Sequence, residues 1–204
     1  ASLNPRMTVG ETIAEPMVVH GITDKTGASE KSVEILKKVG LTSDYASRYP
    51  HELSGGQRQR IGIARALAHE PNLIIADEAV SALDVSIQAQ VVNLMMELQE
   101  EFGLSYLFIS HDMAVIERVC HRVAVMYLGE IVELGTRGQV FENPKHPYTK
   151  KLMKAVPIAD PKLRKKELNL MTDEIPSLVK PIGYEPEKID LIKVEEGHFI
   201  KPYN

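Results

Sequence analysis

Residues 73–78 read Leu-Ile-Ile-Ala-Asp-Glu, a short apolar run that ends in two carboxylates. An uninterrupted apolar run of this length is typical of a strand buried in a parallel sheet. Residues 104–109 form a second apolar run, which His111 closely follows. Ligands bind beyond the carboxyl ends of such strands. We therefore expect Asp77, Glu78 and His111 to lie at one edge of a sheet.

Helical patterns surround these two runs. Thr8 opens a Ser/Thr-x-x-Glu capping box and a first short helix, and a second helix is expected over residues 30–39. A longer helix is expected to start at Ser54 and to be ended by Pro71. Apolar residues on one face predict a further helix over residues 87–98. This order of elements predicts an α/β protein with a parallel sheet and flanking helices.

The later part of the chain predicts a small β element. A short helix over residues 113–120 is followed by two strand-like runs, 122–128 and 130–134, on either side of Gly129. Their spacing predicts a β-hairpin. Beyond Pro157 the periodic pattern weakens.

Composition and charge narrow the classes of function. The apolar content of 44% and the charged content of 25% are those of a globular protein, and the net charge of −4 disfavours nucleic-acid binding. No apolar run approaches the roughly 20 residues that cross a bilayer, so we expect any membrane association to go through a partner. The single cysteine, Cys120, allows no internal disulfide and no iron–sulfur cluster.

The stretch Ser54-Gly55-Gly56-Gln57 has two interpretations. A serine and two glycines at a helix start expose backbone N–H groups beside the positive end of the helix dipole, which makes an anion site, most often for phosphate. Alternatively, Ser54 and Gln57 form only a capping box, and the glycines allow a tight entry to the helix.

The polar residues after the two strands also have two interpretations. Asp77 could hold Mg²⁺ through its water shell, Glu78 could polarise an attacking water, and His111 could hydrogen-bond a phosphate. The alternative is that two solvated acids simply end a strand and that the histidine has no catalytic role. Asp112 has a sufficient role as the N-cap of the next helix.

Taken together, these segments resemble the motifs of ABC ATPases. The signature, Walker B, D-loop and H-loop motifs would be residues 53–57, residues 73–78, residues 81–84 and His111. Segments that resemble the oligopeptide and dipeptide importer branch are residues 1–6, 48–51, 85–90, 123–129 and 146–149. Features that resemble the glutathione importers of that branch, which carry two ATPase halves in one chain, are Ala79 and residues 141–144 and 173–176.

The resemblance implies a fold, a set of parts and a set of roles. The fold is that of a truncated P-loop NTPase of the ABC type. Its parts would be a helical signature subdomain over residues 1–71, the remainder of the catalytic core over 72–156 and a C-terminal extension over 157–204.

In the family, two ATPase domains enclose two ATP molecules, each held by the Walker A loop of one domain and the signature of the other. Residues implied to contact ATP on a partner domain are Ser54, Gly55, Gly56 and Gln57. The remaining implied roles are Mg²⁺ binding by Asp77, general base for Glu78, γ-phosphate contact by His111 and a link between the two sites by Asp84.

The resemblance also implies partners and a location. The partners would be a second ABC ATPase domain, in the same chain or another subunit, together with transmembrane permease subunits and a periplasmic or extracellular substrate-binding protein. Nucleic acid is not among them. The location would be peripheral, on the cytoplasmic face of the cell (inner) membrane. The whole assembly would import peptides, including glutathione as one possibility.

One motif of the family is missing. The Walker A pattern G-x-x-x-x-G-K-S/T does not occur in the 204 residues. We therefore expect that the chain is part of a longer protein and that by itself it has negligible ATP binding and hydrolysis. A neighbouring strand of the family's sheet is missing too, so the edge of the strand over residues 104–109 should be bare and should promote self-association.

Two other functions remain open from the sequence. An ABC ATPase of DNA repair or translation would be expected to carry a long coiled coil or a basic linker between the motifs, and neither occurs. A non-catalytic interaction fragment is the second alternative. Intact Glu78 and His111 argue against a decayed enzyme.

Overall fold

The computed structural model describes residues 3–155 and 189–203. These residues form two compact units, Ala1–Val119 and Cys120–Asn204, which are described separately. The three-part division at residues 71/72 and 156/157 stays a prediction. Residues 173–176, part of the resemblance to glutathione importers, lie outside the described residues.

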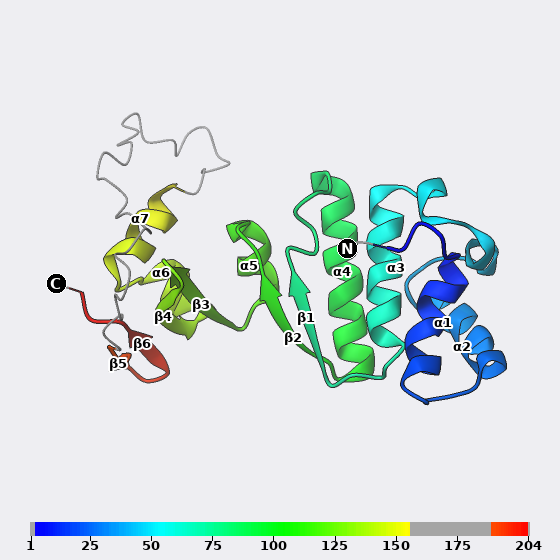
Figure 1. Ribbon diagram of the computed structural model, residues 1–204. Coiled ribbons are helices and arrows are strands. Elements are labelled where there is room, and N and C mark those ends of the chain that lie inside the picture. The colour runs from blue at the N-terminus through cyan, green and yellow to red at the C-terminus, as the bar shows by residue number, and fades with distance from the viewer. Residues whose placement is uncertain (1–2, 156–188, 204) are drawn as a thin grey trace, which may run out of the picture. The chain divides into compact units, whose positions relative to one another are not determined.

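Helices make up most of the first unit, as Figure 1 shows. Its elements are, in order, α1 (Val9–Val19), α2 (Lys25–Lys38), two 3₁₀ turns (Ser43–Ser47 and Pro50–Glu52), α3 (Gly55–Leu67), β1 (Leu73–Asp77), α4 (Val85–Phe102), β2 (Ser105–Ile109) and α5 (Met113–Val119).

The first residues of α1 and α2 are set by the side chains that cap these helices. The predicted capping box of α1 is confirmed, because the Thr8 hydroxyl accepts from Glu11 N and the Glu11 carboxylate accepts from Thr8 N at 2.7 Å. The predicted start of the second helix at Glu30 is wrong. Helix α2 begins at Lys25, because the Asp24 carboxylate accepts from the backbone N–H of Gly27 at 2.9 Å and caps the helix there.

The predicted pair of parallel strands is confirmed. Strands β1 and β2 pair in parallel, with Leu73 opposite Ser105 and Asp77 opposite Ile109. Helix α4 provides the crossover between them and ends at Gly103, which has a φ of 63° that suits glycine. The carboxyl ends of both strands therefore lie at the same edge of the sheet.

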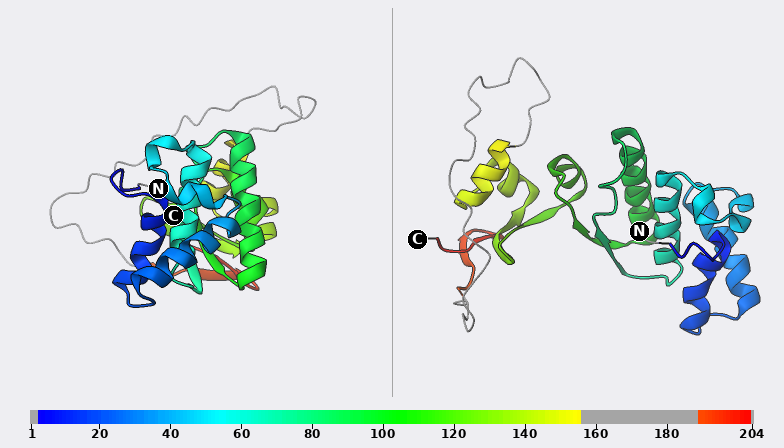
Figure 2. Two further views of the ribbon diagram at one scale, coloured as in Figure 1. Left: turned by 90° about the vertical axis from the view of Figure 1, so that its right-hand side faces the viewer. Right: turned by 45° about the horizontal axis from the view of Figure 1, so that its top comes forward.

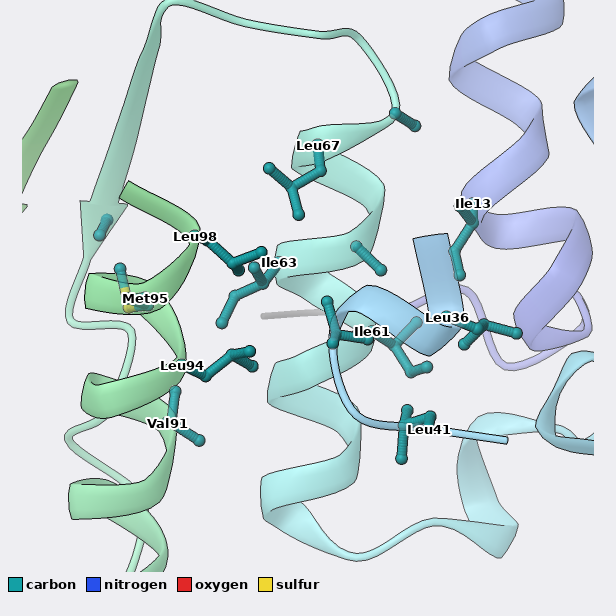
Figure 3. Close-up of a cluster of buried hydrophobic side chains, with 14 of the residues drawn as sticks. Ile13, Leu36, Leu41, Ile61, Ile63, Leu67, Val91, Leu94, Met95 and Leu98 are labelled. Carbon is teal, nitrogen blue, oxygen red and sulfur yellow. The ribbon is translucent and has the colours of Figure 1, made fainter. Parts of the chain in front are cut away.

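A layer of helices forms the core of this unit. Helix α3 lies between α4 on one side and the α1–α2 pair on the other, a stacking that can be followed in Figure 2. In Figure 3, Ile61 of α3 points toward Leu36 of α2, whereas Ile63 points toward Leu94 and Leu98 of α4. All of these side chains are buried, and burial of each stabilises the unit by about 1.5–3 kcal/mol.

The two strands are less buried than their apolar sequence predicts. Ile75 is 62% exposed and Leu107 is 51% exposed, and these two residues are opposite each other in the parallel register. Side chains alternate across a strand, so Ala76 on the other face is buried while these are not. Among the described residues, β1 and β2 pair only with each other.

The second unit contains the predicted hairpin, two further strands and two short helices. Its elements are β3 (Arg122–Tyr127), β4 (Glu130–Thr136), α6 (Arg137–Glu142), α7 (Pro147–Ala155), β5 (Ile192–Glu195) and β6 (His198–Ile200). The antiparallel hairpin of β3 and β4 confirms the small β element, but the sheet continues in the order β3-β4-β6-β5, and neither β5 nor β6 is predicted from the sequence. A small core of Val125, Val132 and Val140 holds the unit together.

Of the helices that the structure describes, none combines the length and the apolar character that crossing a bilayer requires.

Candidate functional site

The chain turns sharply where β1 ends. Glu78 follows Asp77 and has a φ of 45°, in the left-handed region that a non-glycine residue adopts at a cost of about 1–3 kcal/mol. Its N–H donates to the Ile109 carbonyl at 2.9 Å, and its own carbonyl accepts from Ser81 N at 3.2 Å and from the Ser81 hydroxyl at 3.0 Å. These bonds hold the backbone of Glu78 against the end of β2.

This turn brings the Glu78 side chain to the loop that follows β2. Glu78 Oε1 lies 3.1 Å from His111 Nδ1, and the side chains of Glu78 and His111 are 55% and 72% exposed. The expectation that these residues meet at one sheet edge is therefore confirmed. Asp77, opposite Ile109 in the register, ends its strand at the same edge. An open carboxylate–imidazole pair of this kind can orient a water molecule or contact an anion.

Asp112 anchors the loop that carries His111. Its Oδ1 accepts from the backbone N–H of Ala114 at 3.0 Å and of Val115 at 3.3 Å, so the predicted N-cap role is confirmed. Its Oδ2 accepts from Gln88 Nε2 of α4 at 2.8 Å. This bond from Gln88 is the main reason that the pKa of Asp112 lies below its ordinary value. Gln88 is a site residue that the sequence analysis missed.

Asp84 caps the start of α4. Its Oδ1 accepts from Ile87 N at 3.0 Å and from the Ser86 hydroxyl at 2.8 Å. The bond from Ile87 N, followed by the bond from Ser86, lowers the pKa of the Asp84 carboxyl. Asp84 is therefore an anionic cap, and its role in linking two nucleotide sites stays a prediction.

Ser54 and Gln57 form the predicted capping box of α3. Gln57 N donates to Ser54 Oγ at 3.3 Å, and Ser54 N donates to Gln57 Oε1 at 2.9 Å. Gln57 Nε2 also donates to the Tyr45 hydroxyl at 2.9 Å, which fixes its side chain. The capping box is confirmed, and anion binding at this helix start stays a prediction.

The two glycines of this stretch lie against Leu83, which precedes α4, and against the first turn of α4 itself. A methyl group added at Gly56 would come within 2.4 Å of Ile87 Cγ2, whereas one at Gly55 would meet Leu83 Cδ2 at 3.4 Å, an ordinary contact. Gly56 therefore lets α3 start directly beside the first turn of α4. This packing role is a second reason for glycine that the sequence analysis did not identify.

A cavity of about 370 Å³ lies beside α3 and β1. Arg65, His69, Asp77 and Tyr106 are among its lining residues. The Tyr106 hydroxyl is buried and has no hydrogen-bond partner among the described residues, and burial raises the pKa of Tyr106 to about 12. Tyr106 and Asp77 thus contribute to the lining of the same cavity.

Two family models match the sequence. Residues 1–81 match the ABC transporter family, and residues 132–183 match the C-terminal region of oligopeptide/dipeptide transporters. The first match contains Ser54 to Gln57, Asp77 and Glu78, and the second begins within β4.

Curated relatives are similar over nearly the whole chain. The glutathione import ATP-binding protein of Pectobacterium atrosepticum is 60% identical over 200 residues, and the protein of the same name from Escherichia coli is 56% identical. Each alignment covers 98% of this chain but only 32% of the relative. The chain thus spans about a third of the length of the curated relatives it matches.

Solved structures are similar in fold. The ADP conformation of MJ1267, an ATP-binding cassette of an ABC transporter, matches with a TM-score of 0.61 and 24% identity over 74% of this chain and 64% of that chain. The cassette MJ0796, in a dimeric post-hydrolysis state bound to ADP and Pi, matches with a TM-score of 0.58 and 31% identity over 67% of this chain and 59% of that chain. The α/β fold described above is therefore shared with solved ATP-binding cassettes.

Proposed function

Since residues 1–81 of the chain belong to the ABC transporter family and residues 132–183 to the C-terminal region of oligopeptide/dipeptide transporters, we propose that the chain supplies the signature and the hydrolytic edge of an ATPase that energises peptide import. The single observation that carries this proposal is the 3.1 Å contact of Glu78 Oε1 with His111 Nδ1. It supports a site in which these two side chains act on the same substrate.

The chemistry assigned to this pair is the hydrolysis of ATP. Glu78 would accept a proton from a water molecule as that water attacks the γ-phosphorus, the bond from the γ-phosphorus to the bridging oxygen would break, and ADP would leave. His111 would donate a hydrogen bond to the γ-phosphate. Both side chains are more than half exposed, so water and a phosphate can reach them. The left-handed backbone of Glu78 supports this role, because strained residues cluster at functional sites.

The residues at this edge also fit a magnesium ion. Mg²⁺ in phosphoryl-transfer sites is held by one or two carboxylates, waters and phosphate oxygens rather than by a full protein cage. The carboxylate of Asp77 stands at the end of β1 beside Glu78, and the described residues contain no group of three or more His, Cys, Asp or Glu that would make such a cage. Asp77 would hold the ion, which would neutralise charge on the phosphates during the reaction.

The start of α3 and the start of α4 are assigned to the nucleotide of a second ATPase domain. The residues assigned to ATP contact are Ser54, Gly55, Gly56 and Gln57, and Asp84 is assigned to the link between the two sites. The positive end of the α3 dipole supports phosphate contact there. The dimeric state of MJ0796 with ADP and Pi supports the pairing of two such domains.

The relatives support a transported substrate and a set of partners for this proposal. Because relatives that are 56–60% identical are glutathione import ATP-binding proteins, we assign glutathione or a similar short peptide as the cargo. Permease subunits and a substrate-binding protein would complete the importer, and the chain would act at the cytoplasmic face of the inner membrane.

The test uses a chimaeric protein. The 204 residues replace the matching 200 residues of the Pectobacterium relative, so that the remainder of that protein is supplied. We expect steady-state ATP hydrolysis by the chimaera and a loss of about tenfold or more with Glu78→Gln, because a general base contributes at least that much. Glu97→Gln, the same change at an exposed position of α4, is the matched control and should leave the rate unchanged. Equal rates for the two variants would refute the role of Glu78, and a chimaera without ATPase activity would refute the proposed function.

A further inference from the structure

We propose that Gln88 is a positioning residue of this site, which holds the loop of His111 in register with Glu78 and ties that loop to the start of α4. This inference rests on the proposed function. The observation behind it is the hydrogen bond from Gln88 Nε2 to Asp112 Oδ2, at 2.8 Å and between residues 24 positions apart.

The carboxylate of Asp112 divides its two oxygens between two tasks. Oδ1 accepts both backbone N–H groups of the first turn of α5, from Ala114 and Val115. Oδ2 accepts from Gln88. The cap of α5 is therefore complete without Gln88, and loss of the Gln88 amide would leave the helix start intact. What it would remove is the only side-chain hydrogen bond found among the described residues that connects this loop to α4.

Gln88 lies one helical turn after Asp84. The N–H of Gln88 donates to the Asp84 carbonyl at 2.8 Å in the first turn of α4, and the Asp84 carboxylate caps that same turn. A displacement of Asp84 therefore moves Gln88, then Asp112, and with it the adjacent His111. Ile87, in the same first turn of α4, lies against Gly56 at the start of α3. The hydrogen bond thus connects the start of α3 and the cap of α4 with the Glu78–His111 pair.

The charge at Asp112 suits this role. A hydrogen bond to an ionised carboxylate is stronger than a neutral one, and the Gln88 bond is the main cause of the lowered pKa of the Asp112 carboxyl. The contact is partly buried, which limits competition from water. A bond of this kind can fix the orientation of a loop whose catalytic side chain is itself 72% exposed.

Three variants of the chimaera test the inference. Gln88→Met keeps the length of the side chain and removes the donor. Gln88→Arg keeps an N–H donor toward Asp112. Gln90→Met makes the same change at an exposed neighbouring position of α4 and serves as the matched control. Gln88→Met is expected to lower kcat about tenfold and to leave the KM for ATP within about twofold, because it disturbs the catalytic geometry but no ATP contact.

Recovery of kcat in Gln88→Arg distinguishes a positioning role of Gln88 from a general loss of stability. Gln88→Arg should return kcat to within about threefold of the parent, since a charge-assisted bond to Asp112 is restored. The inference is overturned if Gln88→Met and Gln90→Met have the same kcat, if KM rises in place of the fall in kcat, or if Gln88→Arg is as slow as Gln88→Met.

A second readout does not depend on ATPase activity. Diethyl pyrocarbonate modifies accessible imidazoles, and mass spectrometry gives the rate at His111 relative to that at the exposed His51. Because the Glu78 carboxylate shields Nδ1 of His111, Gln88→Met should raise this ratio about threefold, whereas Gln88→Arg and Gln90→Met should not. An unchanged ratio would refute the positioning role even in a chimaera that hydrolyses ATP. A raised ratio in a chimaera without activity would uphold the positioning and refute only the proposed function.

Discussion

Glu133 shows at the residue scale how a buried charge is kept in the second unit. Its side chain is fully buried, and its Oε1 lies 2.7 Å from His198 Nε2 of β6. The backbone N–H groups of Lys145 and His146 also donate to the carboxylate, at 2.8 and 3.0 Å. Burial by itself would raise the pKa of Glu133, but the Thr149 side chain together with these hydrogen bonds outweighs burial and holds the pKa below its ordinary value.

This arrangement predicts an acid-sensitive contribution to stability. Because the folded pKa of Glu133 is lowered, the stabilisation is present above the ordinary pKa of a glutamate, about 4.3, and is lost as the pH falls through the folded value. Glu133→Gln should lower the free energy of unfolding by about 3 kcal/mol at pH 7, because it replaces a buried carboxylate that holds hydrogen bonds with His198 and two backbone N–H groups. Urea denaturation at pH 7 and below pH about 4 measures both values, and the gap between parent and variant should narrow in acid.

The control for this experiment is Glu142→Gln, the same change at an exposed position of α6. It should alter the free energy of unfolding by less than about 0.5 kcal/mol at either pH. A gap for Glu133→Gln that stays constant, or widens, as the pH falls would contradict the account of the buried pair.

At the scale of elements, the contact between α3 and α4 depends on one glycine. Gly56→Ala should destabilise the first unit by about 1–3 kcal/mol, because the new methyl group would press on Ile87 Cγ2 at 2.4 Å. Gly55→Ala is the matched control and should have little effect, since its methyl group would be at 3.4 Å from Leu83. Thermal unfolding monitored by circular dichroism distinguishes the two.

A second-site change checks the cause. Ile87→Ala removes the atom against which the new methyl group would press, and it should recover most of the stability lost in Gly56→Ala. If the double variant is less stable than the parent by the sum of the two single effects, steric contact between α3 and α4 is not the reason for glycine at this position.

The elements differ in how far the sequence predicts them. Strands β1 and β2 are predicted because an apolar run followed by polar residues is a local signal, and the capping box at Thr8 is local too. Strands β5 and β6 are not, because they have only four and three residues. Their formation depends on pairing of β6 with the distant β4 and of β5 with β6. The start of α2 is missed because its signal is the single cap Asp24 rather than apolar periodicity.

In the candidate site, too, features with a local or topological signal are predicted, and features that depend on long-range packing are not. Glu78 and His111 are predicted to meet because parallel strands place their carboxyl ends at one edge, a consequence of topology alone. Gln88 is not predicted, because its partner Asp112 is 24 positions away and only the three-dimensional packing of α4 brings them together. The packing of Gly56 against Ile87 is missed for the same reason.

At the scale of the whole molecule, the exposed sheet face governs the behaviour of the 204-residue polypeptide in solution. Ile75 and Leu107 are 62% and 51% exposed, and in the described residues β2 pairs with β1 alone. An apolar strand with an open edge recruits other strands. Light scattering of the 204-residue polypeptide should give a mass above that of the monomer, and Leu107→Lys should reduce it. Monomers of both proteins would contradict this prediction.

The same polypeptide should bind nucleotide poorly. The 204 residues include the side chains assigned to hydrolysis but no Walker A pattern to hold the phosphates. Isothermal titration with Mg-ATP should therefore show negligible binding, whereas the chimaera with the remainder of the Pectobacterium relative should bind. Tight binding by the 204 residues alone would contradict the assignment of the phosphate contacts.

The most direct test of the central claim, that Glu78 at the end of β1 is the base for ATP hydrolysis, is nucleotide trapping in the chimaera. Glu78→Gln removes the base but keeps the shape of the side chain, so the protein should bind radiolabelled Mg-ATP and close without hydrolysing it. After rapid removal of free nucleotide, we predict that the label retained by this variant is ATP, while the parent protein retains ADP or nothing. Recovery of ADP from the Glu78→Gln variant, at the rate seen for the parent, would contradict the claim.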